Sequence, residues 1–558
     1  MTVRQRQGQR SEGAPRLAGR ALRALLVGAV SALTMSALLF GPLLALLWAA
    51  GEALAQGHAD WLLLALPLGR RAALLLRSLG LAAGVALLDM TLGVLLVSAS
   101  WRWRRPWLRW LSLALLALPP TIHALAWNAA LSFLGVRLAG PWVSLWVSAM
   151  ALLPVGVGLA LVSLETVARP LVDSARTCQT DLSVLARVVL PLAAPLLAAG
   201  GGILFLLSLM DYSIPSLYGV NVYALEIFAE FSASYAPARA LLLAAPLLVT
   251  AAVLLSGGQS WLRRAAQQPT WRLAPWGAPP RFPGAFALAQ QLAVTLWGLQ
   301  MALPLFVLVT LAFGGGEGLA MLADAVSGPV GREFGLSLGI AGAAALLSAP
   351  LSALALSWFN APQRGVPRRG VPRRGAGWAL FLPAALPAPL VGVGLIALWN
   401  RPEFGALYPS LALPVLAALA RFTPFAALAL LAQLRRVDPL LWDAAHVFQS
   451  SGARIPRGGA LRTLLRVQLP LALPGLLTGM CLVFALTLGE LGATLLVAPP
   501  GQSTLTLRIY NYLHYGASDS VAGLCLALAA ATLAAGGLSV VFLNWGARKA
   551  RRARWNHE

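Results

Sequence analysis

Two carboxylic acids, Asp211 and Glu490, stand at matching places in long apolar stretches, each twenty residues after a Leu-Pro pair. An ionisable side chain is costly to place in an apolar segment, so it usually faces a cavity or a partner. Two such carboxylates could meet a cationic substrate or form part of a gate. Alternatively, each acid caps a helix end or pairs with an arginine, and the sequence leaves both interpretations open.

A repeated passage precedes these acids, and it pairs an acid-small-small triplet with a later Leu-Pro. In both copies the acid lies nineteen residues after an apolar-segment proline, Pro154 or Pro424. Small residues allow a partner to approach closely, and an acid can cap a helix or pair with a basic group. The pattern predicts a helix, a turn and a second helix that enters the membrane, which suits a force-transmitting element. The residues concerned are Asp173, Ser174, Ala175, Leu190 and Pro191 in the first copy, and Asp443, Ala444, Ala445, Leu469 and Pro470 in the second.

The elements that must position these residues are membrane helices. Hydrophobic residues make up 59% of the 558 residues, charged residues only 11%, and the mean hydropathy is +0.75. About twenty apolar residues in a helix cross the hydrocarbon core of a bilayer. The sequence therefore predicts an all-α polytopic membrane protein with about twelve spans, near 25–49, 75–98, 110–133, 142–164, 193–211, 240–258, 289–313, 335–358, 377–399, 409–431, 471–490 and 520–544.

Arginine sets the expected orientation, because Lys549 is the one lysine among 42 basic residues. Most of these residues fall in alternate loops and in both tails, so the positive-inside rule places both termini in the cytoplasm. The net charge of +23 is divided among short loops beside the membrane. That distribution favours topology and anionic lipid over nucleic acid, which requires one contiguous basic face.

The ends and the cysteines add little chemistry. The N-terminal basic segment and Ala53-Leu54-Ala55 resemble a signal peptide, but the apolar stretch is about twice the usual length, which favours an uncleaved first span. Cys178, Cys481 and Cys525 are expected on incompatible sides of the membrane and predict no disulfide or metal site. We expect no catalytic residue, no metal and no cofactor.

The repeat extends beyond the loops. Residues 78–88, from Ser78, match residues 337–347, from Ser337, in the second span of each half. Six spans are therefore expected twice in parallel, as in one class of transporter. The predicted domains are a first repeat over 1–258, a cytoplasmic linker over 259–288 and a second repeat over 289–558.

At these residues the chain resembles the permease subunits of binding-protein-dependent ABC importers, in the fused two-domain format of ferric-iron-type and thiamine-type permeases. Their cytoplasmic loop reads Glu-Ala-Ala, three residues, Gly, and later Leu-Pro. The resemblance implies that Asp173, Ser174 and Ala175, then Asp443, Ala444 and Ala445, dock on separate ATPase subunits, of which two copies are expected. It also implies a periplasmic or lipoprotein substrate-binding protein as a partner. A Walker A motif is absent from the sequence, so ATP hydrolysis is expected on another chain.

The loops depart from the family pattern at two points. Gln179 and Gln449 replace the family glycine, and glutamine tolerates a positive φ poorly. The distance from acid to proline is eighteen residues in the first copy and twenty-seven in the second. These differences predict unequal engagement with the two ATPase subunits. The substrate expected from the resemblance is ferric iron or a similar small solute, with thiamine, polyamine and phosphonate also open.

Several other residues within the predicted spans are expected to have structural roles. Gly200 and Gly479 fall at matching positions in the fifth spans and predict close packing around the pathway. Asp89 and Arg421 lack counterparts across the halves and are expected toward the cytoplasmic half or the middle of their spans. That position favours a buried structural pair or snorkelling over substrate binding. His123 is expected to be a core histidine.

Two other classes of polytopic membrane protein fit the sequence less well. A secondary transporter of the major-facilitator type also has six plus six spans, but it predicts a Gly-x-x-x-Asp-Arg-like signature that residues 101–105 lack. A polytopic membrane enzyme requires clustered His, Asp or Glu at one membrane face, and the five histidines are scattered.

Overall fold

The computed structural model describes residues 37–103, 118–133, 135–136, 139–267, 279–314, 316–359, 382–437, 464–515 and 518–555, and all regular elements within these ranges are helices. Ten of these helices are long and apolar enough to cross a membrane. The predicted all-α, multi-pass membrane fold is confirmed.

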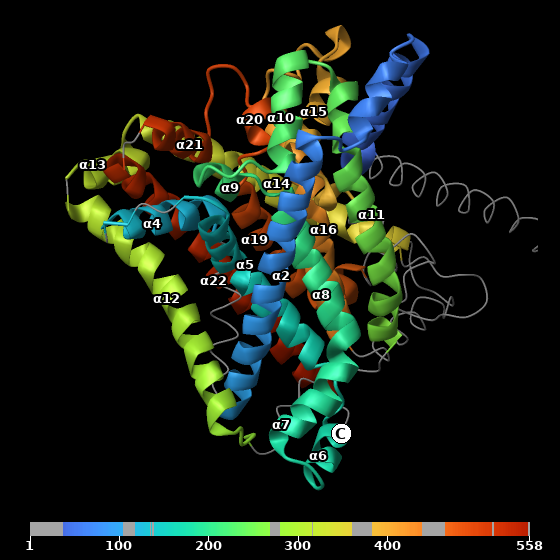
Figure 1. Ribbon diagram of the computed structural model, residues 1–558, viewed down its shortest axis with the longest axis vertical. Helices are drawn as coiled ribbons and strands as arrows, with labels where there is room; N and C mark the ends of the chain where they lie inside the picture. The colour runs from blue at the N-terminus through green and yellow to red at the C-terminus, as the bar shows by residue number, and fades with distance from the viewer. Residues whose placement is uncertain are drawn as a thin grey trace, which may run out of the picture.

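The helices fall into two series of six in chain order (Figure 1). The first series is Ala37–Ala55, α2 (Arg70–Trp103), α4 (Pro120–Phe133), α5 (Pro141–Leu164), α8 (Leu190–Met210) and α11 (Pro237–Gln267). The second is α12 (Gly284–Gly314), α14 (Val330–Phe359), α15 (Ala388–Trp399), α16 (Ala412–Arg436), α19 (Leu469–Leu488) and α22 (Ser518–Trp555). Shorter helices connect them: η1 (Ala59–Ala65), α6 (Arg169–Arg176), α7 (Asp181–Val184), α9 (Ser213–Leu217), α10 (Tyr223–Ser234), α13 (Glu317–Ser327), η4 (Pro383–Ala385), η5 (Pro402–Phe404), α20 (Thr494–Val497) and α21 (Leu505–Tyr515).

The third helix of each series is shorter than the sequence predicts. Residues 110–133 and 377–399 were expected to be continuous spans, but α4 has 14 residues and α15 has 12. The physical reason is proline, which removes a backbone donor and obstructs the preceding turn. Helix α4 begins at Pro120, directly after Pro119, and Pro387 is the N-cap of α15. Residues 110–117 and 377–381 of these predicted spans lie outside the described ranges.

The two series pack in the same way. In the first, α2, α5 and α8 contact one another, and α11 packs on α8. In the second, α14, α16 and α19 form the matching group, and α22 packs on α19. The correspondence extends to single atoms. The Ser78 hydroxyl accepts a 2.8 Å bond from the N–H of Tyr223, and the Ser337 hydroxyl accepts a 2.8 Å bond from the N–H of Leu505.

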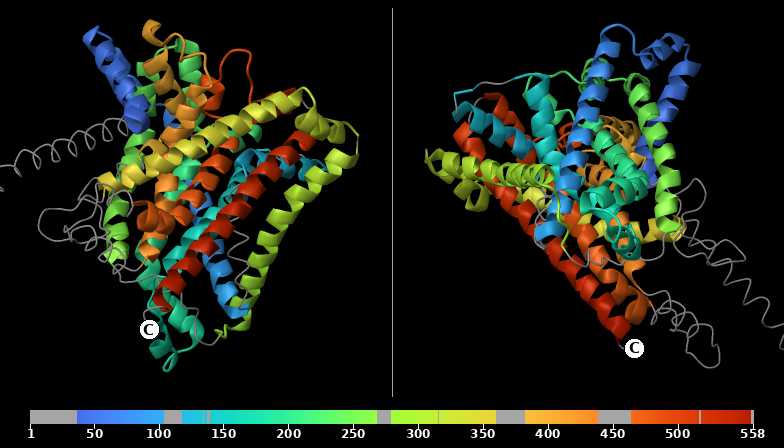
Figure 2. Two further views of the ribbon diagram at one scale, coloured as in Figure 1. Left: turned by 180° about the vertical axis from the view of Figure 1, so that it is seen from behind. Right: turned by 60° about the horizontal axis from the view of Figure 1, so that its bottom comes forward.

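The first helix of each series packs across the boundary. Helix α12 lies along one flank of the molecule in both views of Figure 2, and it contacts α2 and α4 of the first series. Its Gln290 Nε2 donates to Ser98 Oγ at 2.9 Å, and its Gln300 Nε2 donates to the carbonyl of Met150. In the other direction, Pro42 of the helix Ala37–Ala55 lies against Gly394 of α15, where a Cβ would be 2.5 Å from the Pro42 carbonyl oxygen.

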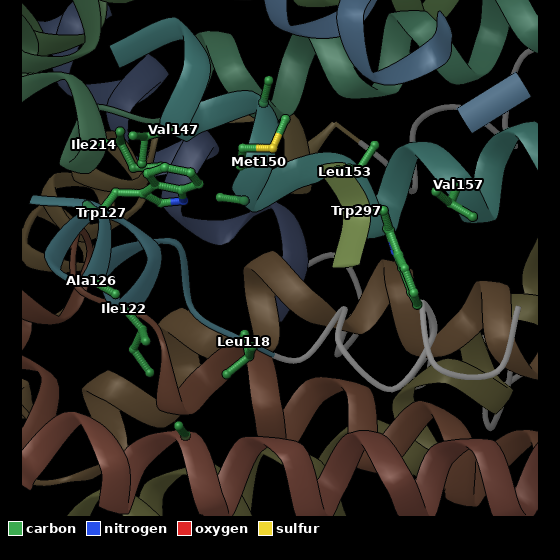
Figure 3. Packing of buried hydrophobic residues seen from close by; sticks show 14 of the residues in the cluster. Leu118, Ile122, Ala126, Trp127, Val147, Met150, Leu153, Val157, Ile214 and Trp297 are labelled. Carbon is green, nitrogen blue, oxygen red and sulfur yellow. The ribbon is translucent and has the colours of Figure 1, made fainter. Parts of the chain in front are cut away.

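The largest buried cluster joins both series. It surrounds α4 and α5, where Trp127 and Trp146 make an edge contact with ring centroids 6.0 Å apart. Figure 3 shows Trp297 of α12 beside Leu153 and Val157 of α5, and Ile214 of α9 near Trp127. Close van der Waals packing holds these membrane helices together, and the members of the cluster come from helices that are hundreds of residues apart.

The segment predicted as a linker is partly helical. Helix α11 continues to Gln267 and α12 begins at Gly284, so the helices enter residues 259–288 from both sides. Residues 279–283 form a described connection without regular structure, and 268–278 lie outside the described ranges.

Candidate functional site: the loop helices and the paired acids

The first candidate loop forms one end of the molecule, which we call the loop end and define by α6 and α7. Both short helices extend beyond the long helices in Figure 1. Asp173 lies in the middle of α6, where its Oδ2 accepts a 3.1 Å bond from Arg169 Nε one turn earlier. Ser174 is exposed, Ala175 is half-buried, and Leu171 of the same helix is 54% exposed. The loop end therefore presents a small, partly apolar surface flanked by charge.

The turn after α6 is made without a glycine. Among the described residues other than glycine, positive φ occurs at Tyr235 (51°) and not at Gln179. The N–H of Gln179 donates to the carbonyl of Ala175 at 3.0 Å, and its Oε1 accepts a 3.1 Å bond from Ser183 Oγ. Thr180 then caps α7 by accepting from the N–H of Ser183. Glutamine at the family glycine position thus causes no backbone strain here.

The most buried ion pair of this loop was missed by the sequence analysis. Arg176 donates two bonds to the carboxylate of Asp181, at 2.7 and 3.2 Å, and the two side chains are 17% and 11% exposed. Asp181 Oδ2 also accepts from the backbone N–H of Arg281, 100 residues later. The five-residue spacing of Arg176 and Asp181 could have suggested the pair, but no local signal points to Arg281. The loop end and the connection between the two series are therefore tied together.

A π-helical turn leads into both Leu-Pro pairs. It covers Leu185–Val189 before Leu190-Pro191, and Leu464–Gln468 before Leu469-Pro470. Proline at the second position of α8 and α19 cannot donate a backbone bond, and its ring obstructs the carbonyl four residues earlier. A wider turn relieves that conflict. The entry into the fifth helix is thus the same in both series.

The rest of the second candidate loop cannot be placed in the same way. Asp443, Ala444, Ala445 and Gln449 lie in 438–463, outside the described residues. Their docking role stays a prediction.

The opposite end, which we call the acid end, carries Asp211 and Glu490 just after α8 and α19. Asp211 Oδ1 accepts from the N–H and the hydroxyl of Ser213, at 3.1 and 2.5 Å. Its Oδ2 accepts from the N–H of Ile214 at 3.4 Å. Asp211 therefore caps α9, which is one of the two roles that the sequence left open for it.

Glu490 has a different partner. Its Oε1 accepts a 2.8 Å bond from the N–H of Ala493, and its Oε2 accepts from Arg421 Nη1 of α16. The Glu490 and Arg421 side chains are 7% and 16% exposed. The guanidinium also interacts electrostatically with Asp211. Arg421 stands near the middle of α16 (Ala412–Arg436), as expected, and its side chain reaches Glu490 at the acid end.

The two series meet closely around these residues. A Cβ at Gly492 would lie 3.2 Å from Cε1 of Tyr212, and a Cβ at Gly489 would lie 2.9 Å from Pro119. Tyr212 is 4% exposed and stacks on Phe228 with ring centroids 6.5 Å apart. The junction at the acid end is closed by these contacts in the state described here.

The paired glycines contact helices of their own series. A Cβ at Gly200 would lie 3.1 Å from Cβ of Leu159 in α5, and one at Gly479 would lie 3.0 Å from Cα of Ala426 in α16. Each glycine thus allows the fifth helix to approach the fourth. Gly475 does the same one turn earlier, where a Cβ would be 2.5 Å from Cβ of Gln433.

The remaining singled-out residues lie within the protein. Asp89 is fully buried at the crossing of α2 and α5, and no described group forms a hydrogen bond to its carboxylate. His123 is 1% exposed in α4. Cys178, Cys481 and Cys525 are free thiols. Within the described ranges, no three His, Cys, Asp or Glu side chains gather as metal ligands would.

The chain is similar to transport permeases of known name. A 186-residue match to the molybdenum transport system permease protein ModB of Escherichia coli K12 is 31% identical and covers 76% of that relative and 31% of this chain. ModB of Haemophilus influenzae is 30% identical over 205 residues, 83% of its length and 34% of this chain.

A third relative is named for 2-aminoethylphosphonate transport. PhnV of Salmonella typhimurium, a transport system permease protein by name, is 29% identical over 153 residues. The match covers 27% of this chain and about half, 54%, of the length of PhnV. No family model matches the chain.

Proposed function

The chain belongs to the family of ABC-type importer permeases, and we propose that it forms the translocation pathway of a binding-protein-dependent importer driven by separate ATPase subunits. The observation that carries this proposal is the loop end. There, α6 and α7 project beyond the long helices and expose Leu171 and Ser174. A short helix that is rigidly held and partly apolar suits docking to another subunit, because it transmits displacement to the helix that follows it.

The internal contacts of the loop support a mechanical role. The Arg176 pair with Asp181 fixes α6 against α7, and the π-helical turn joins α7 directly to α8. A push on α6 therefore moves α8, whose far end carries Asp211. In the second series, Leu469 and Pro470 begin α19 in the same manner, and we propose that Asp443, Ala444, Ala445 and Gln449 contact a second ATPase copy.

We assign the loop end and both termini to the cytoplasm, and the acid end to the side where a periplasmic or lipoprotein binding protein docks. The arginine-rich tails and loops support this orientation. The matching packing of α2, α5, α8 and α14, α16, α19 supports two repeats, 1–258 and 289–558, joined at 259–288. This arrangement leaves the major-facilitator alternative without a specific supporting feature.

For the substrate we propose a small oxyanion in place of ferric iron. The relatives are named for molybdenum and 2-aminoethylphosphonate transport, and none of those reported above is named for iron. The carboxylates that suggested a cation are engaged, because Asp211 caps α9 and Glu490 pairs with Arg421.

The coupling proposal is tested by charge reversal at the loop end. The full chain is purified with its chromosomally neighbouring ATPase and binding protein. Asp173→Arg, alone and with Asp443→Arg, is expected to reduce complex formation and ATPase stimulation at least about tenfold, as loss of a few interface contacts does. The matched control is Glu403→Arg, an exposed acid at the acid end that should leave the ATPase complex intact. Intact complexes in all variants would refute the docking role.

A further inference from the structure

The junction at the acid end combines two buried hydrogen-bond donors that have no acceptor with two carboxylates whose oxygens all accept bonds. All four side chains around it are largely buried: Asp211 and Tyr212 come from the first series, and Arg421 and Glu490 from the second. Both carboxylates are occupied, Asp211 by Ser213 and Ile214, and Glu490 by Ala493 and Arg421. The acceptors at this junction are therefore already in use.

Two donors at the same junction have no acceptor. Arg421 Nε and the Tyr212 hydroxyl are buried, and within the described ranges neither forms a hydrogen bond. A buried donor without a partner costs free energy, so such groups in a native protein call for an explanation. Burial raises the pKa of the Tyr212 phenol, and the hydroxyl thus remains protonated and able to donate.

The chemistry of the vacant donors selects the class of ligand. A guanidinium and a phenolic hydroxyl complement a group that only accepts, and guanidinium geometry matches phosphate-like oxygens in particular. A metal cation would compete for carboxylate oxygens that already accept hydrogen bonds here. The position also suits a transported species, because the junction is where the two series meet, at Tyr212 and Gly492.

We propose that Arg421 and Tyr212 form a contact site for a small tetrahedral oxyanion, a phosphonate or molybdate, as it passes the junction between the two repeats. This inference rests on the proposed importer function and adds to it a place where the permease itself touches the substrate. Arg421 releases part of its contact with Glu490 to the anion, and Glu490 keeps the guanidinium oriented through its own bond to Ala493. The site is one-sided, because Ala151 stands in the first repeat where Arg421 stands in the second.

The test measures anion binding to the purified full-length chain in lipid nanodiscs, without binding protein. Molybdate and 2-aminoethylphosphonate are titrated by calorimetry, with chloride as the comparison anion. The unmodified chain is expected to bind at least one of the two oxyanions and to prefer it over chloride. Tyr212→Phe should weaken that binding about tenfold, the effect of one hydrogen bond to a charged group. The double variant Arg421→Gln with Glu490→Gln removes the charge without leaving a lone ion, and it should abolish binding.

Matched controls exclude general damage. Tyr218→Phe removes a buried hydroxyl that already donates to the carbonyl of Ala124 at 2.9 Å, and it should leave anion affinity unchanged. Arg239→Gln with Glu230→Gln removes another partly buried Arg-Glu pair, outside the junction, and should also have no effect on affinity.

Three results would overturn the proposal: no oxyanion binding by the unmodified chain, no preference over chloride, or equal affinity in the junction and control variants. Failure of the proposed importer function is seen separately. In that case the unmodified chain does not stimulate the ATPase, or Asp173→Arg leaves the stimulation unchanged. A chain that couples to its ATPase but binds no oxyanion retains the proposed function and loses this site.

Discussion

The two series of helices share a backbone hydrogen bond, but the ion pairs beside it carry reversed charges. The Ser78 hydroxyl accepts a 2.8 Å bond from the first N–H of α10, and the Ser337 hydroxyl accepts a 2.8 Å bond from the first N–H of α21. Each hydroxyl also donates to a carbonyl four residues earlier in its own helix at 2.9 Å. The ion pairs beside them are reversed. Glu226 of α10 pairs with Arg70, whereas Arg508 of α21 pairs with Glu333.

This difference separates two kinds of interaction. A hydroxyl that satisfies a particular backbone N–H has a fixed position, because the helix start it serves has a fixed geometry. An ion pair needs only opposite signs at short distance, and either helix can carry either sign. At these two helix starts the backbone hydrogen bond is therefore retained while the charges of the neighbouring ion pair are exchanged.

The largest expected difference between the repeats lies at the acid end. Arg421→Leu leaves the Glu490 carboxylate buried without its counter-charge and should lower the free energy of unfolding by about 3–5 kcal/mol. Asp211→Ala removes a helix cap and should lower it by about 1 kcal/mol. Thermal unfolding followed by tryptophan fluorescence in one detergent measures both. Equal losses would mean that the two acids have equivalent surroundings.

The next difference is how closely the fourth and fifth helices of each series approach each other, α5 and α8 in the first and α16 and α19 in the second. Gly475→Ala should cost about 1–3 kcal/mol, because the added methyl would lie 2.5 Å from Cβ of Gln433. Gly200→Ala should cost less, since its nearest neighbour is the Leu159 Cβ at 3.1 Å, and Gly202→Ala, with no atom within 4 Å, is the control. Unfolding midpoints of the three variants give the ranking, and a loss for Gly202→Ala as large as for Gly475→Ala would contradict it.

A third measurement asks whether the retained hydrogen bonds are equivalent. Ser78→Ala and Ser337→Ala should each destabilise the protein by about 1 kcal/mol, because each leaves one helix-start N–H without an acceptor. The exposed Ser256→Ala serves as the comparison. Amide exchange at Tyr223 and Leu505 should accelerate in the respective variants. If only one of the two serine variants were destabilised, the two matching hydrogen bonds would contribute unequally to the free energy of unfolding.

The smallest effect belongs to the reversed ion pairs. Arg508→Glu places two acids together and should cost about 1 kcal/mol or less, and Arg508→Glu with Glu333→Arg should restore stability. Arg70→Glu should have a smaller effect, since the Arg70 side chain is 72% exposed. A double-mutant cycle on unfolding midpoints isolates each coupling energy. Failure of the swapped pair to recover would mean that the sign on each helix matters.

The sequence predicted the helices and the matching places of the acids because both follow from local pattern. Apolar length identified the membrane fold, and the spacing from Leu-Pro located Asp211 and Glu490. The prolines that begin the short third helices, Pro120 of α4 and Pro387 before α15, are also visible in the sequence, although the predicted spans run through both. At Gln179, by contrast, the expected difficulty did not occur, since the turn uses ordinary φ values.

Partners at long range could not be predicted in this way. Arg421 is 69 residues from Glu490, and their contact depends on how α16 crosses α19. Arg281 reaches Asp181 across 100 residues. A repeat in the sequence likewise does not indicate which half a helix packs against, so the positions of α12 and of the helix Ala37–Ala55 emerge only from the three-dimensional arrangement.

The position of Pro42 against Gly394 has a consequence for biosynthesis. The helix Ala37–Ala55 is synthesised before α15, and its contact surface on α15 leaves the ribosome about 350 residues later, which at 5–20 residues per second is roughly 20–70 s. During that interval the helix can pack only on the first series, whose residues share a buried cluster with its Leu46 and Ala50. A segment made early thus waits for part of its final surroundings, and α15 of the second series completes them.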